Sequence, residues 1–280
     1  MLTPITSDGY RCAMDASRFR SRYGPWALVT GASDGIGRAI AAELARRGLN
    51  LVLAARNQAR LEAIAREVNA ATGVETLVVA ADLADANGAE AVADATRNLD
   101  VGLVVLAAGF GTVGPFTDLA LAAELEMIAV NVTAVTALTH AFTPRLTRRA
   151  SGGIVLFGSI VGWQGVPGQA TYSATKSYVQ SFAEALHGEL KPQGVDVISV
   201  APGPVHTGFG ARAGMTMNSA TTPEVVATAT LSALGRRTTV VPGLQAKFLT
   251  ASLMPLPRRL RSEILGNVVR RMRAAPAPAV

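Results

Sequence analysis

Short apolar runs alternate with longer amphipathic segments along most of the chain. The runs contain many Val, Leu and Ala residues and cover residues 26–30, 51–55, 77–80, 103–106, 152–157, 195–200 and 238–241. Between them, apolar residues recur at helical steps, as Ile36, Ile40 and Leu44 do. Continuous apolar strands that alternate with helices predict an α/β fold with a parallel sheet.

The composition indicates a globular protein that packs mainly with small and aliphatic side chains. Of 280 residues, 49% are apolar and 16% are charged, which suits one large α/β domain or two smaller ones. No apolar run approaches the ~20 residues that span a bilayer, and residues 1–24 lack the apolar core of a secretory signal. The single Cys12 excludes an intrachain disulfide and a cysteine metal cluster. We therefore expect a cytoplasmic protein without a metal site.

The net charge of +6 is concentrated at the two ends of the chain. Residues 1–24 hold four Arg and two Asp, and residues 244–280 hold one Lys, six Arg and one Glu. The middle, residues 25–243, holds 15 basic and 17 acidic residues. A body with a slight acidic excess argues against a nucleic-acid-binding core.

The run at residues 26–30 leads into a glycine-rich turn, which is followed by a helical pattern. The turn contains Gly31, Gly35 and Gly37. Glycine permits close backbone approach to a pyrophosphate, and the free N–H groups of a helix N-terminus favour an anion. Strand, turn and helix in this order indicate a dinucleotide site, although an ordinary glycine-rich turn remains the alternative.

Arg56 follows the second run, where such a sheet faces the adenine ribose. An acidic residue there would bind the ribose hydroxyls of NAD, whereas a cation suits the 2′-phosphate of NADP. No acidic residue lies between Asn50 and Asn57, so we expect NADP(H) in preference to NAD(H). The acidic Asp34 inside the glycine turn points the other way, and a merely exposed Arg56 is the alternative.

Two further strand ends carry candidate cofactor contacts. Asp82 follows the third run, where it would accept a hydrogen bond from the adenine amine or cap the next helix. The fourth run ends at Ala107, Ala108 and Gly109. Side chains this small leave room for a flat ring above the sheet.

A possible proton-transfer group lies between Ser159 and Lys176. Tyr172 and Lys176 stand four residues apart in a helical pattern, so both lie on one face, and Ser159 ends an apolar run. A neighbouring ammonium is expected to lower the pKa of the phenol, and a serine hydroxyl can hold a carbonyl oxygen. The spacing alone is weak, because Tyr and Lys are common on helix surfaces.

Two other polar positions need an explanation. Asn131 lies among apolar residues in a helical pattern, so it is either buried with hydrogen-bond partners, bending the helix and holding a water near Lys176, or exposed. After the run at 195–200, the rigid turn at 201–207 lies where ligands bind, and its backbone and Thr207 could hold a carboxamide. His206 in this turn is expected only to flank the loop.

These motifs occur in an order and spacing that resembles the short-chain dehydrogenase/reductase family over residues 24–241. The matching residues are Thr30, Gly31, Gly35, Gly37, Asp82, Asn131, Ser159, Tyr172, Lys176, Pro202 and Gly203. The resemblance implies a single Rossmann-type doubly wound domain with a seven-stranded parallel sheet and helices on both faces. It also implies an oxidoreductase that transfers hydride between nicotinamide and a carbonyl/alcohol pair, and a homodimer or homotetramer formed through the long helices.

The resemblance also implies roles for individual residues. Tyr172 would be the general acid/base, Lys176 would lower its pKa and bind the nicotinamide ribose, and Ser159 would orient the substrate oxygen. Asn131 would support the proton relay. The implied cofactor-binding residues are Gly31, Ser33, Asp34, Gly35, Ile36, Gly37, Arg56, Asp82, Ala108, Gly109, Tyr172, Lys176, Pro202, Gly203, Val205 and Thr207.

One motif departs from the family. Members usually have Asn-Asn-Ala-Gly after the fourth strand, and this chain has Leu106, Ala107, Ala108 and Gly109. The missing asparagine amides normally brace the sheet and approach the cofactor. An alternative function is therefore a dinucleotide-binding regulatory or membrane-recruited module with little turnover.

The region of residues 208–222 is glycine-rich and contains Met215 and Met217. In the family this region forms a substrate lid, and a flexible lid with methionines suits an apolar substrate. Other apolar residues would either line the substrate pocket or belong to ordinary packing. They are Phe110, Val113, Phe116, Val161, Trp163 and Val166. Further on, Thr222 is expected to cap a helix that begins at Pro223.

Three segments are therefore expected: an N-terminal extension (1–24), a Rossmann-type catalytic domain (25–243) and a basic helical tail (244–280). In the tail, apolar residues repeat at helical steps among six arginines. This pattern suits a helix on an anionic membrane surface, on the body or on a partner subunit, and packing on protein is slightly favoured. The end of the tail is expected to be disordered, and the true start, Met1 or Met14, is left open.

Overall fold

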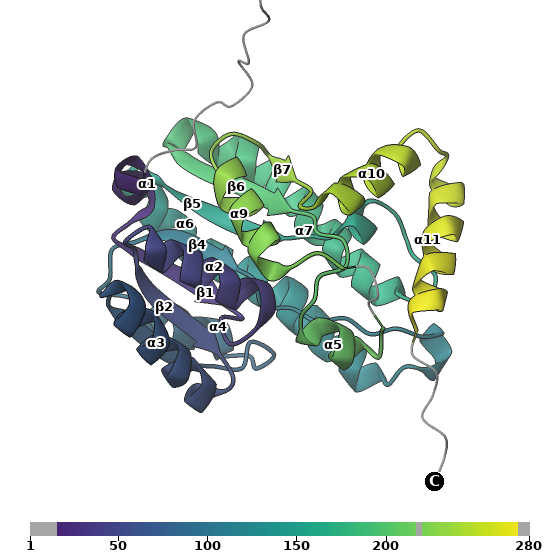
Figure 1. The fold of residues 1–280 in the computed structure, drawn as a ribbon, viewed down its shortest axis with the longest axis horizontal. Coiled ribbons are helices and arrows are strands. Elements are labelled where there is room, and N and C mark those ends of the chain that lie inside the picture. The colour runs from purple at the N-terminus through teal and green to yellow at the C-terminus, as the bar shows by residue number, and fades with distance from the viewer. Residues whose placement is uncertain (1–15, 217–219, 274–280) are drawn as a thin grey trace, which may run out of the picture.

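The computed structural model describes residues 16–216 and 220–273. Within these residues, seven parallel strands form one sheet in the order β3-β2-β1-β4-β5-β6-β7 (Figure 1). The strands are β1 Trp26–Thr30, β2 Asn50–Ala55, β3 Thr76–Ala80, β4 Val101–Leu106, β5 Gly152–Phe157, β6 Val195–Val200 and β7 Thr239–Val240. The strand order reverses between β1 and β4, which makes this the doubly wound α/β fold that the sequence predicts.

Helices cover both faces of the sheet (Figure 1). The longer ones are α1 Ala16–Tyr23, α2 Gly35–Arg46, α3 Gln58–Thr72, α4 Gly88–Ala95, α5 Leu121–Ile128, α6 Ala134–Arg149, α7 Ala170–Leu190, α8 Gly208–Ala213, α9 Pro223–Ala233, α10 Leu244–Leu253 and α11 Arg258–Met272. Short turns of helix are η1 Phe116–Asp118, η2 Ala129–Thr133, η3 Ile160–Trp163 and η4 Lys191–Gln193.

Alternate strand residues supply two separate cores. In β1, Ala27 and Val29 join the core beneath α2, α3 and α9, whereas Leu28 joins the core beneath α4, α6 and α7. A strand covered on both faces needs apolar residues at every position, which explains the continuous runs in the sequence. The predicted limits of β1, β5 and β6 are correct, and those of the other strands differ by one or two residues at an end.

The helical pattern expected at residues 119–148 is divided into three parts. α5 passes through the π-helical turn η2 into α6, and the most apolar 18-residue window of the continuous segment Leu121–Arg149 has a mean hydropathy of 1.5. By length and composition this segment could cross a membrane. Leu138, Phe142 and Leu146 are fully buried against the sheet, however, so its apolar character is that of a core helix.

The basic tail packs on the body of the protein. α10 and α11 form a helical hairpin at the right-hand edge of Figure 1. Leu253, Leu265 and Val269 are buried in one cluster with Ile160 and Val166, which follow β5. Packing on protein was the slightly favoured alternative. The expected disorder falls on residues 274–280, which lie outside the described residues, as does Met14.

Candidate functional site

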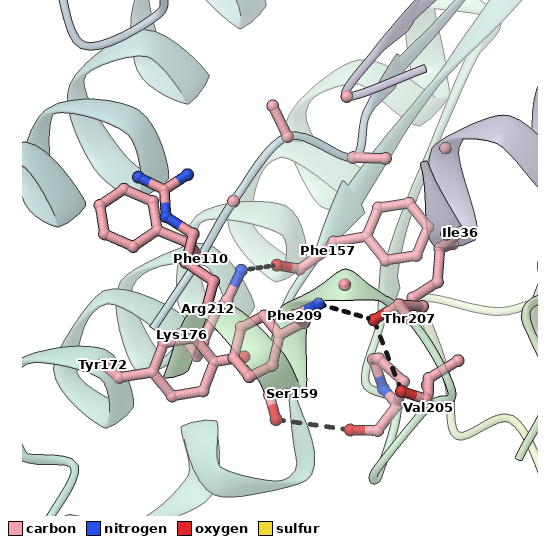
Figure 2. Close-up of a pocket in the computed structure, with 18 of the residues that line it drawn as sticks. Ile36, Phe110, Phe157, Ser159, Tyr172, Lys176, Val205, Thr207, Phe209 and Arg212 are labelled. Atoms are coloured by element: carbon pink, nitrogen blue, oxygen red, sulfur yellow. Dashed lines mark hydrogen bonds between the residues drawn. The ribbon is translucent and has the colours of Figure 1, made fainter. Parts of the chain in front are cut away.

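A cavity of ≈ 470 Å³ opens at the carboxyl ends of the strands, where open parallel sheets bind ligands (Figure 2). All residues predicted to contact a cofactor line this cavity. Ser159, Tyr172 and Lys176 line it as well, although 13 residues separate Ser159 from Tyr172 in the chain. Asn131 does not line the cavity and lies behind it.

The glycine turn forms one wall because its backbone approaches neighbouring chain segments closely. Gly31 has φ +67°, and a Cβ there would lie 2.9 Å from the backbone of Ala108. Gly35 has φ +51°, and a Cβ there would lie 2.7 Å from the methyl group of Thr207. These glycines let the turn pack closely against Ala108 and Thr207, and the uncapped backbone N–H groups at the start of α2 favour an anion.

Asp34, the acidic residue of this turn, makes two hydrogen bonds to neighbouring segments. Its Oδ1 accepts a hydrogen bond from Nη2 of Arg60 at 3.2 Å, and its Oδ2 accepts one from the backbone N of Gly208 at 3.1 Å. The carboxylate is therefore paired with a cation and connects the glycine turn to α8. Because Arg60 offsets the negative charge of Asp34, this carboxylate is a weaker argument against a bound 2′-phosphate.

Arg56 follows β2, as predicted, and lies between two carboxylates. Its Nη1 is 3.5 Å from Oε1 of Glu126 and 3.7 Å from Oδ2 of Asp82. The same Glu126 oxygen accepts a hydrogen bond from Nη2 of Arg212 on α8 at 2.8 Å. Glu126 thus joins the cation at the end of β2 to the helix that covers the cavity.

Asp82 shapes the loop that follows β3. Its Oδ1 accepts a hydrogen bond from the backbone N of Ala84 at 2.9 Å. α4 begins only at Gly88, behind Asn87, so the alternative in which Asp82 caps this helix is wrong. Thr222 precedes α9 as expected, but its side chain makes no capping hydrogen bond.

The side chains of Ser159, Tyr172 and Lys176 converge on one part of the cavity (Figure 2). Nζ of Lys176 donates a hydrogen bond to the backbone O of Phe157 at 2.8 Å and lies 5.7 Å from the centre of the Tyr172 ring. Oγ of Ser159 donates to the backbone O of Pro202 at 3.4 Å. The end of β5 thus positions both the serine and the lysine.

The electrostatics of this group differ from the expectation. Burial raises the pKa of Tyr172 above its ordinary value, and a hydrogen bond with Ser159 acts in the opposite direction. Burial also lowers the pKa of Lys176 to about 8. The expected lowering of the tyrosine pKa by Lys176 is therefore wrong for this structure, because burial disfavours both charged forms.

Asn131 is buried, with 1% of its surface exposed, which excludes the alternative of an exposed polar position. Its Nδ2 donates to the backbone O of Phe110 at 2.9 Å and to Oγ1 of Thr175 at 3.2 Å, and its Oδ1 accepts from the backbone N of Phe110 at 3.2 Å. It lies in the π-helical turn η2, a feature that often marks functional sites. Asn131 therefore fixes the loop after β4 against α7.

The altered motif after β4 retains a brace of a different kind. The backbone N of Ala108 donates a hydrogen bond to Oγ1 of the buried Thr30 at 3.2 Å. A Cβ at Gly109 would lie 3.0 Å from Oδ1 of Asn131 and 3.5 Å from Nζ of Lys176. A backbone amide and a threonine hydroxyl thus connect the ends of β4 and β1 here without the usual asparagine amides.

Several cavity residues were not predicted from the sequence. The Phe209 ring centre lies 5.4 Å from that of Tyr172, and the Arg212 guanidinium lies 3.7 Å from the centre of the Phe110 ring (Figure 2). Leu265, Val268, Val269 and Met272 of α11 form another wall. The helical periodicity of the tail was the only indication of these four residues.

The expected apolar walls are partly correct. Phe110, Val161 and the lid residue Met215 line the cavity, and Met217 lies outside the described residues. Four other candidates do not line the cavity and belong to packing or to the surface. They are Val113, Phe116, Trp163 and Val166. His206 is exposed and outside the cavity, as expected.

Comparison with known proteins identifies the class to which this fold and site belong. The family model described as short chain dehydrogenase matches residues 25–218. The chain therefore belongs to the short-chain dehydrogenase family of nicotinamide-dependent oxidoreductases, as its motifs predict.

Individual relatives agree with this assignment. The chain is 34% identical to a 7β-hydroxysteroid dehydrogenase of Clostridium sardiniense over 66% of this chain and 71% of that protein. It is also 34% identical to the human inactive hydroxysteroid dehydrogenase-like protein 1, over 87% of this chain and 79% of that one. A short-chain dehydrogenase from Sphingobium yanoikuyae in complex with NADPH superposes with a TM-score of 0.74 at 30% identity, over 91% and 98% of the two chains.

Proposed function

We propose that this protein is an NADP(H)-dependent oxidoreductase that interconverts a carbonyl and an alcohol on an apolar substrate. The observation that carries the proposal is the convergence of Ser159, Tyr172 and Lys176 on one cavity at the carboxyl edge of the sheet. The residues present fit a dinucleotide, because the glycines of the turn and the start of α2 line the cavity, where free backbone N–H groups favour an anion.

The protein's own residues hold the reactants and supply the proton. The cofactor, when bound, supplies the hydride. Ser159 donates a hydrogen bond to the substrate oxygen and holds it near the phenol. Tyr172 acts as general acid in reduction, and its raised pKa keeps its proton in place until negative charge develops on that oxygen. The Lys176 ammonium stabilises the phenolate that results.

Asn131 and the loop that it holds act indirectly. By fixing the backbone of Phe110, Asn131 sets the position of Gly109 relative to Lys176. Its amide also contacts Thr175, the neighbour of Lys176. We assign Asn131 a positioning role, in which it keeps the floor of the cavity and the catalytic helix in register.

Replacement of Tyr172 by Phe tests the proposal. Loss of the general acid is expected to lower kcat by roughly 10²–10⁴-fold. NADPH binding, followed by its fluorescence, is expected to stay close to wild type, because the ring remains in place. Tyr178→Phe is the matched control, since it removes an exposed hydroxyl from the same helix. Wild-type turnover in Tyr172→Phe would overturn the assignment.

The preference for NADP(H) is supported by Arg56 at the end of β2. Its side chain lines the cavity, and a 2′-phosphate would replace the longer contacts with Asp82 and Glu126 by charge-assisted hydrogen bonds. Arg56→Ala is expected to raise the KM for NADPH about 10- to 100-fold and to leave the KM for NADH nearly unchanged. Arg97→Ala removes an exposed arginine far from the cavity and is the control.

An apolar substrate is supported by the end of the cavity beyond Tyr172. Phe209 lies beside Tyr172, with 5.4 Å between their ring centres. Met215, Leu249 of α10 and Val269 of α11 line the same cavity. The hydroxysteroid activity in the name of the Clostridium sardiniense relative fits a bulky, mostly apolar body. We therefore propose a substrate of lipid or steroid size with a carbonyl at one end.

A second candidate function is a dinucleotide-binding module with little turnover. It is favoured by the altered Leu106–Gly109 motif and by the human relative whose name calls it inactive. NADPH oxidation against a panel of apolar ketones, and the reverse reaction with alcohols, separates the two candidates. NADPH binding without turnover in either direction would support this second function.

We also propose self-association through α5. Leu121, Leu125 and Ile128 are exposed apolar residues on this helix, and the exposed Tyr178 of α7 adds to the surface. A second copy would remove this surface from water. Light scattering of wild type and Leu125→Asp tests the proposal, and an unchanged monomer mass in both would contradict it.

A further inference from the structure

α10 presents an apolar face to the outside of the molecule. Leu244 and Phe248 are 85% and 78% exposed, and Met254 at the end of the helix is 56% exposed. Leu244, Phe248 and Ala251 recur at helical steps of four and three, so they lie along one side. The opposite side, with Ala246 and Leu253, is buried against the body. α10 is therefore held on the body by one side, while its apolar outer side stays available to a partner.

The hairpin also carries exposed basic side chains. Lys247 lies within α10, and Arg258 and Arg259 begin α11 directly after an uncharged segment, residues 248–257. Glu263 is the single acidic residue of the two helices, and it pairs with Arg259. Arg258 makes no ion pair within the described part of the chain. The hairpin thus combines exposed apolar surface with a strong excess of positive charge.

The exposed apolar surface and the positive charge together indicate which kind of partner binds this face. A two-fold contact between two copies would place the same basic surface against itself, which like-charge repulsion disfavours. An anionic phospholipid surface, in contrast, attracts basic side chains and accepts apolar ones at the boundary between headgroups and acyl chains. Figure 1 shows the hairpin at the edge of the molecule, where a planar surface can approach it.

We propose that the outer face of the α10–α11 hairpin docks on an anionic lipid bilayer. Leu244 and Phe248 enter the interface, while Lys247, Arg258 and Arg259 contact the headgroups. The protein lies on the surface and does not span it, because α10 has only 10 residues.

The position of the hairpin connects docking to the cavity. Leu249 of α10 and Val268 of α11 line the cavity, and Val268 is also partly exposed at 37%. A carbonyl compound dissolved in the bilayer would therefore meet the cavity wall directly at the docked face. This last step rests on the proposed function, whereas docking itself does not.

Vesicle sedimentation of the full chain tests the docking, without cofactor or substrate. We expect binding to phosphatidylcholine vesicles that contain phosphatidylserine, and much weaker binding to phosphatidylcholine alone or in added salt. Phe248→Ser is expected to weaken binding about tenfold or more. Arg258→Gln is expected to weaken it about fivefold. Val225→Ser, an exposed apolar position on α9, is the control and is expected to bind like wild type.

The outcomes are distinct. Wild type that fails to sediment with phosphatidylserine vesicles at low salt, or Phe248→Ser that binds like wild type, overturns the proposal. So does a wild-type dimer that dissociates in Phe248→Ser, since the occupant would then be a second copy. Circular dichroism checks that the variants fold, which exposed positions permit. Because no turnover is measured, failure of docking is separate from failure of the proposed function.

Discussion

Two described segments, residues 16–24 and 244–273, lie outside residues 25–218, which the family model matches, and they pack at opposite ends of the strands. At the amino end, Phe19 and Tyr23 of α1 are fully buried near the starts of β4, β5 and β6. At the carboxyl end, α10 and α11 pack beside the residues that follow β5. Both ends are integral to the fold, but only the second reaches the cavity.

The amino end is fixed by one carboxylate. Oδ2 of Asp196, at the start of β6, accepts hydrogen bonds from the Tyr23 hydroxyl at 2.7 Å and from Nε of Arg22 at 2.6 Å. Burial and the neighbouring carboxylate raise the pKa of Tyr23, so the phenol stays protonated. Tyr23 and Asp196 lie at the amino ends of the strands, away from the cavity, so their contact contributes to stability.

The described carboxyl-terminal segment is only partly buried, and some of its residues line the cavity. Leu265 and Val269 are buried, but Leu244 and Phe248 are exposed, and Val269 also lines the cavity. Because parallel sheets bind ligands at the carboxyl ends of their strands, a segment added there can alter the ligand site. In this protein, the segment added at the amino ends of the strands contributes to stability. The segment added at the carboxyl ends of the strands contributes to the wall of the cavity.

Tyr23→Ala gives the largest expected effect on this comparison. Removing a fully buried aromatic ring is expected to lower the free energy of unfolding by about 3–5 kcal/mol, measured by denaturant titration. Tyr23→Phe, which removes only the hydroxyl, is expected to cost about 1 kcal/mol. Turnover per folded molecule is expected to stay the same in both. A changed KM would mean that α1 influences the cavity.

Gly266→Val affects the other end. A Cβ at Gly266 would lie 3.0–3.1 Å from the ring of Pro167, so a larger side chain displaces α11. Overpacking at this contact costs ~1–3 kcal/mol, which is expected to move α11 out of its place in the cavity wall. The KM for a bulky apolar ketone is therefore expected to rise about tenfold. Gly188→Val is the control, because a Cβ there meets nothing within 4 Å. An unchanged KM would show that α11 is not a fixed wall.

The smallest expected effect concerns pH. Burial lowers the pKa of Lys176 to about 8, and Lys176 is charged below that value. The kcat/KM for reduction is therefore expected to fall as the pH rises through about 8, because the phenolate loses its stabilising ammonium. Tyr23→Phe and Gly266→Val are expected to keep this dependence, since neither residue contacts Lys176. A shift in Gly266→Val, measured in a pH–rate profile, would connect the tail to the proton chemistry.

Much of the fold could be predicted because patterns among neighbouring residues specify its strands, helices and turns. Continuous apolar runs specify strands that are covered on both faces, and glycines specify the turn before α2. Most of the candidate cofactor residues also follow from local motifs at strand ends or in the turns after them, whereas Tyr172 and Lys176 lie in α7. The resemblance to a known family predicted that Ser159, Tyr172 and Lys176 act together, and the structure brings them to one cavity.

Contacts between distant segments could not be predicted in this way. Glu126 of α5 joins Arg56, which follows β2, to Arg212 of α8, and no sequence spacing relates these residues. The burial of Asn131 in a π-helical turn depends on the loop after β4 and on α7. A side chain's partners in such cases are decided by how whole elements pack.

The sequence by itself determined the elements, their order and the chemical groups available at the carboxyl edge, because periodicity and glycine turns act over a few neighbouring residues. The tertiary structure decided the protonation of those groups and the walls around them. Burial, which no local pattern reports, raises the pKa of Tyr172 and lowers that of Lys176. Packing between distant segments likewise places residues of the basic amphipathic tail in the wall of the cavity.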